Sequence, residues 1–288
     1  MPELPEVETV RRGLSPALTG AIVERVQLNR PDLRFPFPDG FADRLKGQKI
    51  LEVGRRAKFL MMPLSSGELM TAHLGMTGRF SVLDGNRTVE PGAFYDPAPA
   101  SGYEHAVFFL KREDGVPVKL TYSDPRRFGF FELFAAEDRA TAARFADLGP
   151  EPLSEDFTPE ALQQRLAGKA APLKAALLDQ RIVAGLGNIY VCEALFRAGL
   201  SPRRKSATIG PARAERLAAS IKGVLSEAIR AGGSTLQDYA AVDGTEGSFQ
   251  QQFDVYDRAG EPCRVCGKTV ERFVQSGRSS FACGRCQR

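Results

Sequence analysis

Four of the five cysteines lie near the C-terminal end of the sequence in two Cys-x2-Cys pairs, and this spacing constrains the local fold strongly. Sixteen residues separate the pairs, which are Cys263-Cys266 and Cys283-Cys286. Two such pairs supply the four thiolates of a tetrahedral zinc site. The segment between them carries Thr, Val and Phe around Ser276-Gly277, which is typical of a β-hairpin. We therefore predict one structural Zn2+ held at a β-hairpin.

Two other roles for the cysteine pairs fit less well. Disulfide bonds need an oxidising compartment, and a redox Cys-x2-Cys needs a surrounding βαβ pattern. The acidic N-terminus shows no apolar signal segment, and the apolar run FLMMPL at 59–64 is too short to span a bilayer. We expect a cytoplasmic protein with reduced thiols and no membrane partner. Cys192 lies among apolar residues of a predicted helix and is expected in a core.

The hydrophobic pattern changes along the 288 residues, a length that suits about two domains. An amphipathic helix is predicted at 5–16. From about 48 to 133 the apolar residues come in short runs cut by turn residues, which indicates a β-sandwich or a barrel. These runs are KILEV, KFLMM, ELMTAHL, HAVFFL, VKLTY and FGFFEL. A stretch of weak strand character with a proline-rich end follows at roughly 134–150, and we interpret it as a linker.

Helical signals dominate the rest of the chain. Thr158, Pro159 and Glu160 supply a cap, a first-turn proline and an acid, which together begin a helix. A second helix is expected from Asn188 to a stop at Gly199, and a third from Pro211 to about Arg230. The predicted domains are 1–133, a linker at 134–150, a helical domain at 151–242, and a polar loop with the cysteine-rich segment at 243–288.

Positive charge is concentrated in the second half of the chain. The whole chain has a net charge of only +4. Residues 201–222 hold six Arg and Lys against one Glu, and residues 258–288 hold seven against two Glu. Such segments favour a surface that faces a polyanion, although a solvated charged face is an alternative for either one.

A glycine-containing turn precedes the second predicted helix. Gly185-Leu186-Gly187-Asn188 combines close backbone approach with the free N–H groups of a helix start, which favours an anion. Most such turns are merely turns. Nearby Lys174, Arg181 and Arg203-Arg204-Lys205 favour a contact with a nucleic-acid backbone phosphate.

The chain begins MPELPEVETV, which places two prolines and three carboxylates in its first eight residues. From Leu4 onward a helix start explains the pattern, with Pro5 in the first turn and Glu6 and Glu8 near the positive end of the helix. Pro2 and Glu3 have no role in that explanation.

Considered together, these segments resemble the formamidopyrimidine-DNA glycosylase (Fpg, MutM) family along essentially the whole chain. The matching segments are PELPEVET, RRAKFL at 55–60, HLGMTGR at 73–79, SDPRRFG at 123–129, DLGPEPL at 147–153, GLGNIYVCEALF at 185–196 and the cysteine-rich tail. The resemblance implies an α+β fold. Its parts are an N-terminal two-layer β-sandwich with an N-terminal helix, a helix–two-turn–helix domain, and a β-hairpin zinc finger.

The resemblance also implies a catalytic set. Removal of Met1 would leave the secondary amine of Pro2 as a nucleophile that forms a Schiff base with the sugar. Glu3 would serve as proton donor and acceptor, and Glu6 would position or polarise the same site. Lys58 matches the family's second catalytic lysine, whereas the residues alone indicate an ordinary lysine on a strand.

Six further residues match DNA contacts of the family. Met76, Arg126 and Phe128 would fill the gap left by an extruded base, although core packing is the plainer interpretation of Met76 and Phe128. Backbone phosphates would be contacted by Lys174, Asn188 and Arg278. The partner is then double-stranded DNA with oxidised bases or abasic sites. We expect a monomer that associates with the nucleoid through its substrate.

The expected activity is that of a bifunctional glycosylase and abasic-site lyase for oxidised purines such as 8-oxoguanine and formamidopyrimidines, with β,δ-elimination. One alternative is an endonuclease VIII-like enzyme for oxidised pyrimidines, and another is a non-catalytic binder of damaged DNA. Leu4 and the set Met76, Arg126 and Phe128 favour the first activity over endonuclease VIII. Segments 85–102, 103–106 and 243–248 are less similar to the family, and the resemblance implies that the last of them folds over the flipped base.

Overall fold

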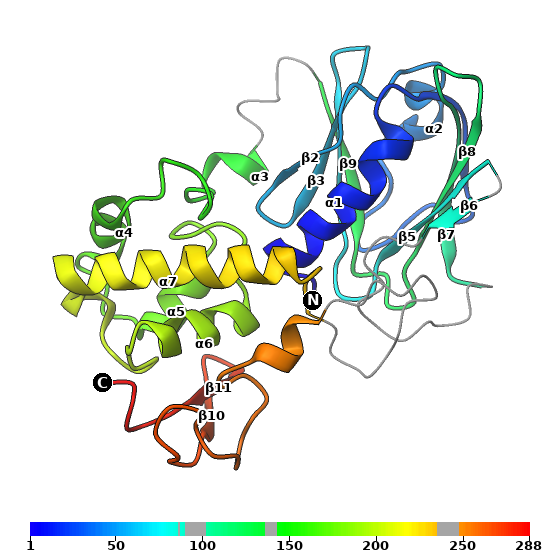
Figure 1. The fold of residues 1–288 in the computed structure, drawn as a ribbon. Coiled ribbons are helices and arrows are strands. Elements are labelled where there is room, and N and C mark those ends of the chain that lie inside the picture. Colours follow the sequence, from blue (N-terminus) through cyan, green and yellow to red (C-terminus); the bar gives the residue numbers. More distant parts are fainter. Residues whose placement is uncertain (86, 90–101, 136–142, 235–247) are drawn as a thin grey trace. The chain divides into compact units, whose positions relative to one another are not determined.

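The computed structural model describes residues 1–85, 87–89, 102–135, 143–234 and 248–288. The chain forms two compact units (Figure 1): one comprises residues 1–146 and 232–248, and the other residues 147–231 and 249–288. Parts of three segments singled out in the sequence lie outside the described residues. These are 136–142 of the predicted linker, 86 and 90–101 of the less similar segment, and 243–247 of the polar loop.

The first unit is a two-layer β-sandwich, with two separate antiparallel sheets rather than a barrel. The five-stranded sheet has the order β1 (Ile22–Leu28), β7 (Glu104–Lys111), β8 (Pro117–Ser123), β5 (Arg79–Asp84) and β6 (Arg87–Val89). The four-stranded sheet has the order β2 (Gly54–Arg56), β3 (Phe59–Pro63), β4 (Leu69–His73) and β9 (Phe130–Phe134). The sequence prediction of a sandwich is therefore confirmed.

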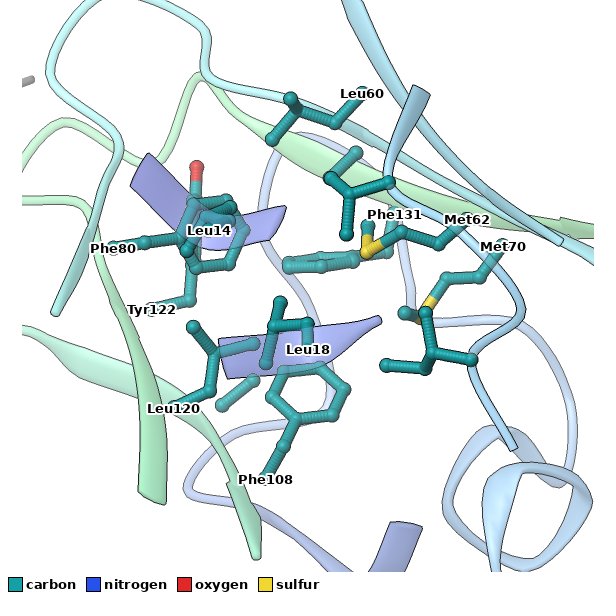
Figure 2. Packing of buried hydrophobic residues seen from close by; sticks show 14 of the residues in the cluster. Leu14, Leu18, Leu60, Met62, Met70, Phe80, Phe108, Leu120, Tyr122 and Phe131 are labelled. Carbon is teal, nitrogen blue, oxygen red and sulfur yellow. The ribbon is translucent and has the colours of Figure 1, made fainter. Parts of the chain in front are cut away.

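The core of the first unit lies between these sheets. Buried side chains alternate along β3, where Leu60 and Met62 face inward, as the two-residue period of a strand requires. They meet aromatic side chains that include Phe80, Tyr122 and Phe131, and Figure 2 shows these groups pointing toward one another. The rings of Tyr122 and Phe131 make a T-shaped contact, with ring centroids 5.0 Å apart.

Helix α1 (Leu4–Leu18) contributes the third part of this core. Its apolar face buries Val7, Val10, Leu14 and Leu18, a spacing that places them on one side of a helix. The helix contacts β2 and β3 of one sheet and β5 of the other (Figure 1). The predicted helix at 5–16 is confirmed with slightly wider bounds. Two short helices, α2 (Phe41–Leu45) and α3 (Ala143–Ala146), complete the unit.

Local patterns were misleading at three places in this unit. Strand β1 lies outside the region from which strands were predicted. The run KILEV at 49–53 forms only isolated bridges, such as Ile50 with Leu64. Lys58, predicted within a strand, lies in the turn that joins β2 to β3.

The second unit is helical with a β-hairpin. Its elements are α4 (Pro159–Leu166), α5 (Leu173–Leu178), α6 (Asn188–Arg197), α7 (Pro211–Arg230), the 3-10 turns η1 (Ser206–Thr208) and η2 (Phe249–Gln252), and the strands β10 (Glu271–Gln275) and β11 (Arg278–Ala282). Helix α7 packs against α4 and α6, and β11 packs against α6. The three predicted helix starts and the hairpin are confirmed. Cys192 is buried in the apolar cluster beneath the hairpin, as expected.

Two details explain the local structure of the second unit. The Thr158 side chain accepts a hydrogen bond from the Ala161 amide at 3.1 Å and so caps α4. Ser276 and Gly277 both have positive φ, at 51° and 73°, which matches the tight turn that hairpins prefer. None of the helices that the structure describes has the length and apolar character needed to cross a membrane.

Candidate active site

Two carboxylates begin helix α1. Glu3 is the N-cap residue and Glu6 stands three positions later, and each side chain accepts a hydrogen bond from the backbone of the other. The Glu3 amide donates to Glu6 Oε2 at 2.8 Å. Both residues are buried, with exposed fractions of 3% and 2%. Buried carboxylates need such partners, and the positive end of the helix stabilises their charge further.

Glu6 also binds a segment far away in the sequence. Its Oε1 accepts hydrogen bonds from the Ser234 amide at 2.9 Å and from the Ser234 hydroxyl at 3.0 Å. Both carboxylate oxygens of Glu6 thus hold backbone in place. This geometry identifies Glu6 as a residue that positions Glu3 and Ser234.

The amino group of Met1 lies in this charged environment. Burial lowers its pKa from the ordinary value of a terminal amine, and the positive charges of Lys58 and Arg126 lower it further. The carboxylates of Glu3 and Glu6 act in the opposite direction. The structure therefore brings the start of the chain, the two carboxylates and two basic side chains to one place. A buried amine of lowered pKa is neutral in larger proportion near pH 7, which makes it a better nucleophile.

Lys58 is held in a tight turn by a neighbouring arginine. Ala57, directly before it, has a φ of +51°, a left-handed conformation that costs energy for a residue with a side chain. Arg55 donates a hydrogen bond to the Ala57 carbonyl at 2.8 Å and a second to Glu8 of α1 at 3.3 Å. These bonds tie the turn to the helix that carries Glu3. Lys58 itself is only 6% exposed, so it is not the solvated strand lysine that its local sequence suggests.

Arg126 and Phe128 lie on the loop between β8 and β9. Phe128 is 41% exposed, which contradicts the core-packing interpretation of this residue. The Arg126 guanidinium lies over the Phe128 ring at 4.7 Å. Between them Arg127 has a φ of +56°. Both side chains help to line a surface pocket of about 540 Å3 together with Arg34.

Met76 lies on the loop between β4 and β5 and is half-buried. The sequence predicted functional residues at the tips of this loop and of the β8–β9 loop, but it assigned no role to the residue at the base of both loops. That residue is Asp124, whose side chain is completely buried. The sequence signal for Asp124 was the acid in SDPRRFG at 123–129, which was interpreted only as part of a segment that matches the family.

The three predicted phosphate contacts meet in the second unit. Lys174 is 1% exposed and donates to the Ser279 carbonyl at 2.6 Å and to the Ser280 hydroxyl at 2.8 Å. Asn188, the first residue of α6, donates to the same Ser279 carbonyl at 3.0 Å. Arg278 precedes Ser279 and is exposed at the start of β11. Lys174 and Asn188 therefore fix the strand that presents Arg278.

The four paired cysteines form one cluster. Their sulfur atoms all lie within 4.8 Å of one another, with Cys263 and Cys286 at 3.9 Å and Cys266 and Cys283 at 3.4 Å. Four sulfurs at about 2.3 Å from one metal ion would be separated by similar distances. Partial burial and the neighbouring sulfurs raise the pKa of the Cys286 thiol to about 12, so a cation is needed to hold it as a thiolate. The donor set and its spacing fit one structural Zn2+, and four protein ligands leave no open position for catalysis.

Glu193 fixes the segment that precedes the cluster. This carboxylate on α6 is completely buried and accepts hydrogen bonds from three successive amides, those of Asp254, Val255 and Tyr256, at 2.8 to 3.0 Å. Burial raises the pKa of Glu193, and the three amide donors oppose that shift. Sequence reasoning assigned no role to this residue.

Family models match three parts of the chain. The formamidopyrimidine-DNA glycosylase N-terminal domain matches residues 1–131, and the H2TH domain of the same glycosylase matches residues 148–240. The zinc finger found in FPG and IleRS matches residues 260–288.

Full-length relatives and solved structures agree with these matches. The chain is 52% identical over 297 residues to the formamidopyrimidine-DNA glycosylase of Chelativorans sp. (strain BNC1) and 53% identical over 290 residues to that of Caulobacter vibrioides (strain NA1000 / CB15N), with complete coverage of both chains in each case. It is similar to the crystal structure of MutM (Fpg) from Thermus thermophilus, with 42% identity and a TM-score of 0.80 over 99% of this chain and 98% of that one. It is also similar to Lactococcus lactis Fpg in complex with DNA containing an abasic site, with 30% identity and a TM-score of 0.84 over 99% of each chain.

Replacement of one cysteine of the cluster tests the zinc assignment. We expect wild-type protein to contain one zinc ion per chain and Cys266→Ser to lose it, because three thiolates and a hydroxyl bind the ion much more weakly. Metal analysis after gel filtration measures this. The matched control is Cys192→Ala, which alters a buried cysteine outside the cluster and should retain zinc. Full zinc content in Cys266→Ser would contradict the assignment.

Proposed function

The chain belongs to the formamidopyrimidine-DNA glycosylase family, and from that premise we propose that it removes oxidised purines from DNA and then cleaves the strand at the abasic site. The observation that carries the proposal is the amine at the start of the chain, which has a lowered pKa and lies beside buried carboxylates and Lys58. Enzymes that attack a sugar carbon covalently need a neutral nucleophile with acids and bases beside it. This place in the first unit supplies both.

Pro2 is the proposed nucleophile once Met1 is removed. Its nitrogen is then a secondary amine in the buried position next to Glu3. Attack on C1′ of the damaged nucleotide forms a C–N bond while the bond to the base breaks. Loss of the proline N–H proton and cleavage of the sugar C1′–O4′ bond, whose oxygen takes up a proton, then convert this adduct into an iminium ion, which stays cationic because its nitrogen carries no proton. It acidifies the neighbouring C2′ position, and β-elimination followed by δ-elimination releases the two phosphates.

Glu3 is the proposed proton donor and acceptor for these steps. It adjoins the nucleophile in sequence, and its backbone is fixed by the capping hydrogen bonds to Glu6. Glu6 keeps Glu3 in place and anchors Ser234, so it acts through position. In the structure, burial and then the positive charge of Lys58 lower the pKa of the Met1 amine, and we propose that they act in the same way on the amine of Pro2 once Met1 is removed.

The exposed pair Arg126 and Phe128, together with Met76, is proposed to enter the DNA helix where a damaged base leaves it. Extrusion of a base costs a few kcal/mol in lost stacking and pairing, so apolar side chains that fill the gap make it less costly. The exposed ring of Phe128 and the guanidinium stacked on it suit this role. Arg126 also offers donors to the base left on the opposite strand.

The second unit is proposed to hold the DNA backbone. Arg278 is presented by a strand that Lys174 and Asn188 fix, and the zinc cluster stiffens the same hairpin. Phosphate contacts of this kind set the register of the protein on DNA without reading sequence. We propose that the partner is double-stranded DNA with oxidised bases or abasic sites, that the protein acts as a monomer, and that it works in the cytoplasm.

Borohydride trapping tests the proposed chemistry. Wild-type protein lacking Met1, incubated with a duplex that contains 8-oxoguanine opposite cytosine, should form a covalent adduct that denaturing gels resolve. Lys58→Ala should slow adduct formation at least about tenfold, because a positioned catalytic group contributes about 10²–10⁴-fold. The matched control Lys46→Ala changes an exposed lysine on the same unit and should leave the rate unchanged.

Two outcomes of the trapping experiment would contradict the proposal. DNA binding without any adduct would identify a non-catalytic binder of damaged DNA. Adducts formed only with oxidised pyrimidines would identify an endonuclease VIII-like specificity instead.

The salt dependence of DNA binding tests the proposed backbone contacts. The affinity should fall steeply as salt rises, because each neutralised phosphate contributes a slope of about −0.9 in a plot of log K against log salt. Arg278→Ala should reduce the magnitude of this slope by about one contact and weaken binding to every sequence similarly. The control Arg25→Ala changes an exposed arginine on β1 and should leave the slope unchanged. An identical slope for Arg278→Ala and wild type would show that Arg278 does not contact a phosphate.

A further inference from the structure

The completely buried carboxylate of Asp124 lies at the base of the two loops that carry the proposed gap-filling residues. One of its oxygens accepts a hydrogen bond from the Thr77 hydroxyl, on the loop that carries Met76. The other accepts from the Gly129 amide at 2.8 Å, at the end of the loop that carries Arg126 and Phe128. One carboxylate therefore holds one point on each loop.

Backbone and neighbouring groups of Asp124 fix the same junction. Its carbonyl accepts from the Arg127 amide at 3.1 Å, which closes the turn in which Arg127 has positive φ. The same carbonyl lies 2.8 Å from His105 Nε2. The Arg126 amide donates to the Thr77 hydroxyl at 3.3 Å, so the hydroxyl of Thr77 bonds to two points of the other loop, Arg126 near its tip and Asp124 at its base.

Tyr122 adds a third group to the junction. Its hydroxyl lies 3.4 Å from the second oxygen of Asp124. Burial, followed by the Asp124 charge, raises the pKa of Tyr122 well above its ordinary value, so the phenol keeps its proton and can donate. A β-carbon on Gly129 would overlap this hydroxyl, and a β-carbon on Gly75 would overlap the backbone of Phe128 and Gly129. The Gly75 end of one loop therefore lies directly against the backbone of the other, with no room for a side chain at that position.

We propose that Asp124 is a positioning residue that sets the Met76 loop and the Arg126–Phe128 loop in the one relative placement that lets their side chains enter DNA together. This inference rests on the proposed function and deepens it, since it concerns how the same site handles duplex DNA. Asp124 is buried and touches no substrate; it acts through the backbone of the loops. A carboxylate suits the task because it accepts from several donors at once, whereas an amide in its place offers one acceptor oxygen and two N–H donors.

A comparison of two DNA substrates separates this role from a general role in folding. Excision of 8-oxoguanine from a duplex requires the gap to be filled, whereas cleavage of a preformed abasic site in single-stranded DNA has no base to extrude and no opposite base to hold. We expect Asp124→Asn to slow single-turnover excision from duplex about 10- to 100-fold, in line with the cost of misplacing groups by about 1 Å. Cleavage of the single-stranded substrate should stay within about twofold of wild type. Asp43→Asn, an exposed acid on α2, is the matched control and should leave both rates unchanged.

A second variant and a second measurement keep the inference testable if Asp124→Asn does not fold. Thr77→Val removes one donor to the carboxylate and should show the same difference between substrates with a smaller effect. Hydrogen exchange of the amides at 74–78 and 126–129 should be faster in either variant than in wild type, without any substrate present. Equal losses on both substrates, or unchanged duplex excision, would overturn the role of Asp124. Failure of wild type on both substrates would instead overturn the proposed function, and the exchange measurement would still decide whether Asp124 fixes the loops.

Discussion

The reciprocal capping of Glu3 and Glu6 at the start of α1 is the interaction on which the site depends. It places two buried carboxylates at the positive end of a helix, where their charge is stabilised. The apolar face of that helix is buried in the sandwich core, and this packing also fixes the position of the first residues of the chain. A terminus that would otherwise fray becomes an ordered part of the first unit, next to Lys58.

The same kind of contact holds loops and turns in place in both of the described units. Arg55 ties the Lys58 turn to Glu8 of α1, and Asp124 joins two loops. In the second unit, Lys174 and Asn188 converge on the Ser279 carbonyl. In each case a charged or amide side chain makes a hydrogen bond to the backbone of another segment or turn. The exposed side chains of Phe128 and Arg278 therefore lie on backbone that is already fixed, so their proposed contacts with DNA require little further ordering.

The sequence alone predicted those features of the fold that depend on residues close together in the chain. The zinc cluster followed from two Cys-x2-Cys pairs because each pair is a local turn, and the starts of α4 and α6 followed from capping chemistry. Contacts between distant segments had no such signal: Ser234 reaches Glu6 across 228 residues, and Lys174 reaches Ser279 across 105. Lys58 was misplaced on a strand because its turn depends on Arg55 and on a positive φ at Ala57. The proposed roles of Pro2 and Glu3 came only from the resemblance, since a nucleophile at a terminus leaves no periodic pattern.

The most direct test of whether the start of the chain supplies the nucleophile is to locate the residue that carries the trapped DNA remnant. After borohydride reduction and nuclease digestion, the protein is cleaved and the peptides are sequenced by mass spectrometry. We predict that the remnant is attached to the nitrogen of Pro2 in the peptide that begins PELPEVETV, and that every trapped chain lacks Met1. A remnant on the side chain of Lys58, or on chains that retain Met1, would contradict the assignment of Pro2 as the nucleophile.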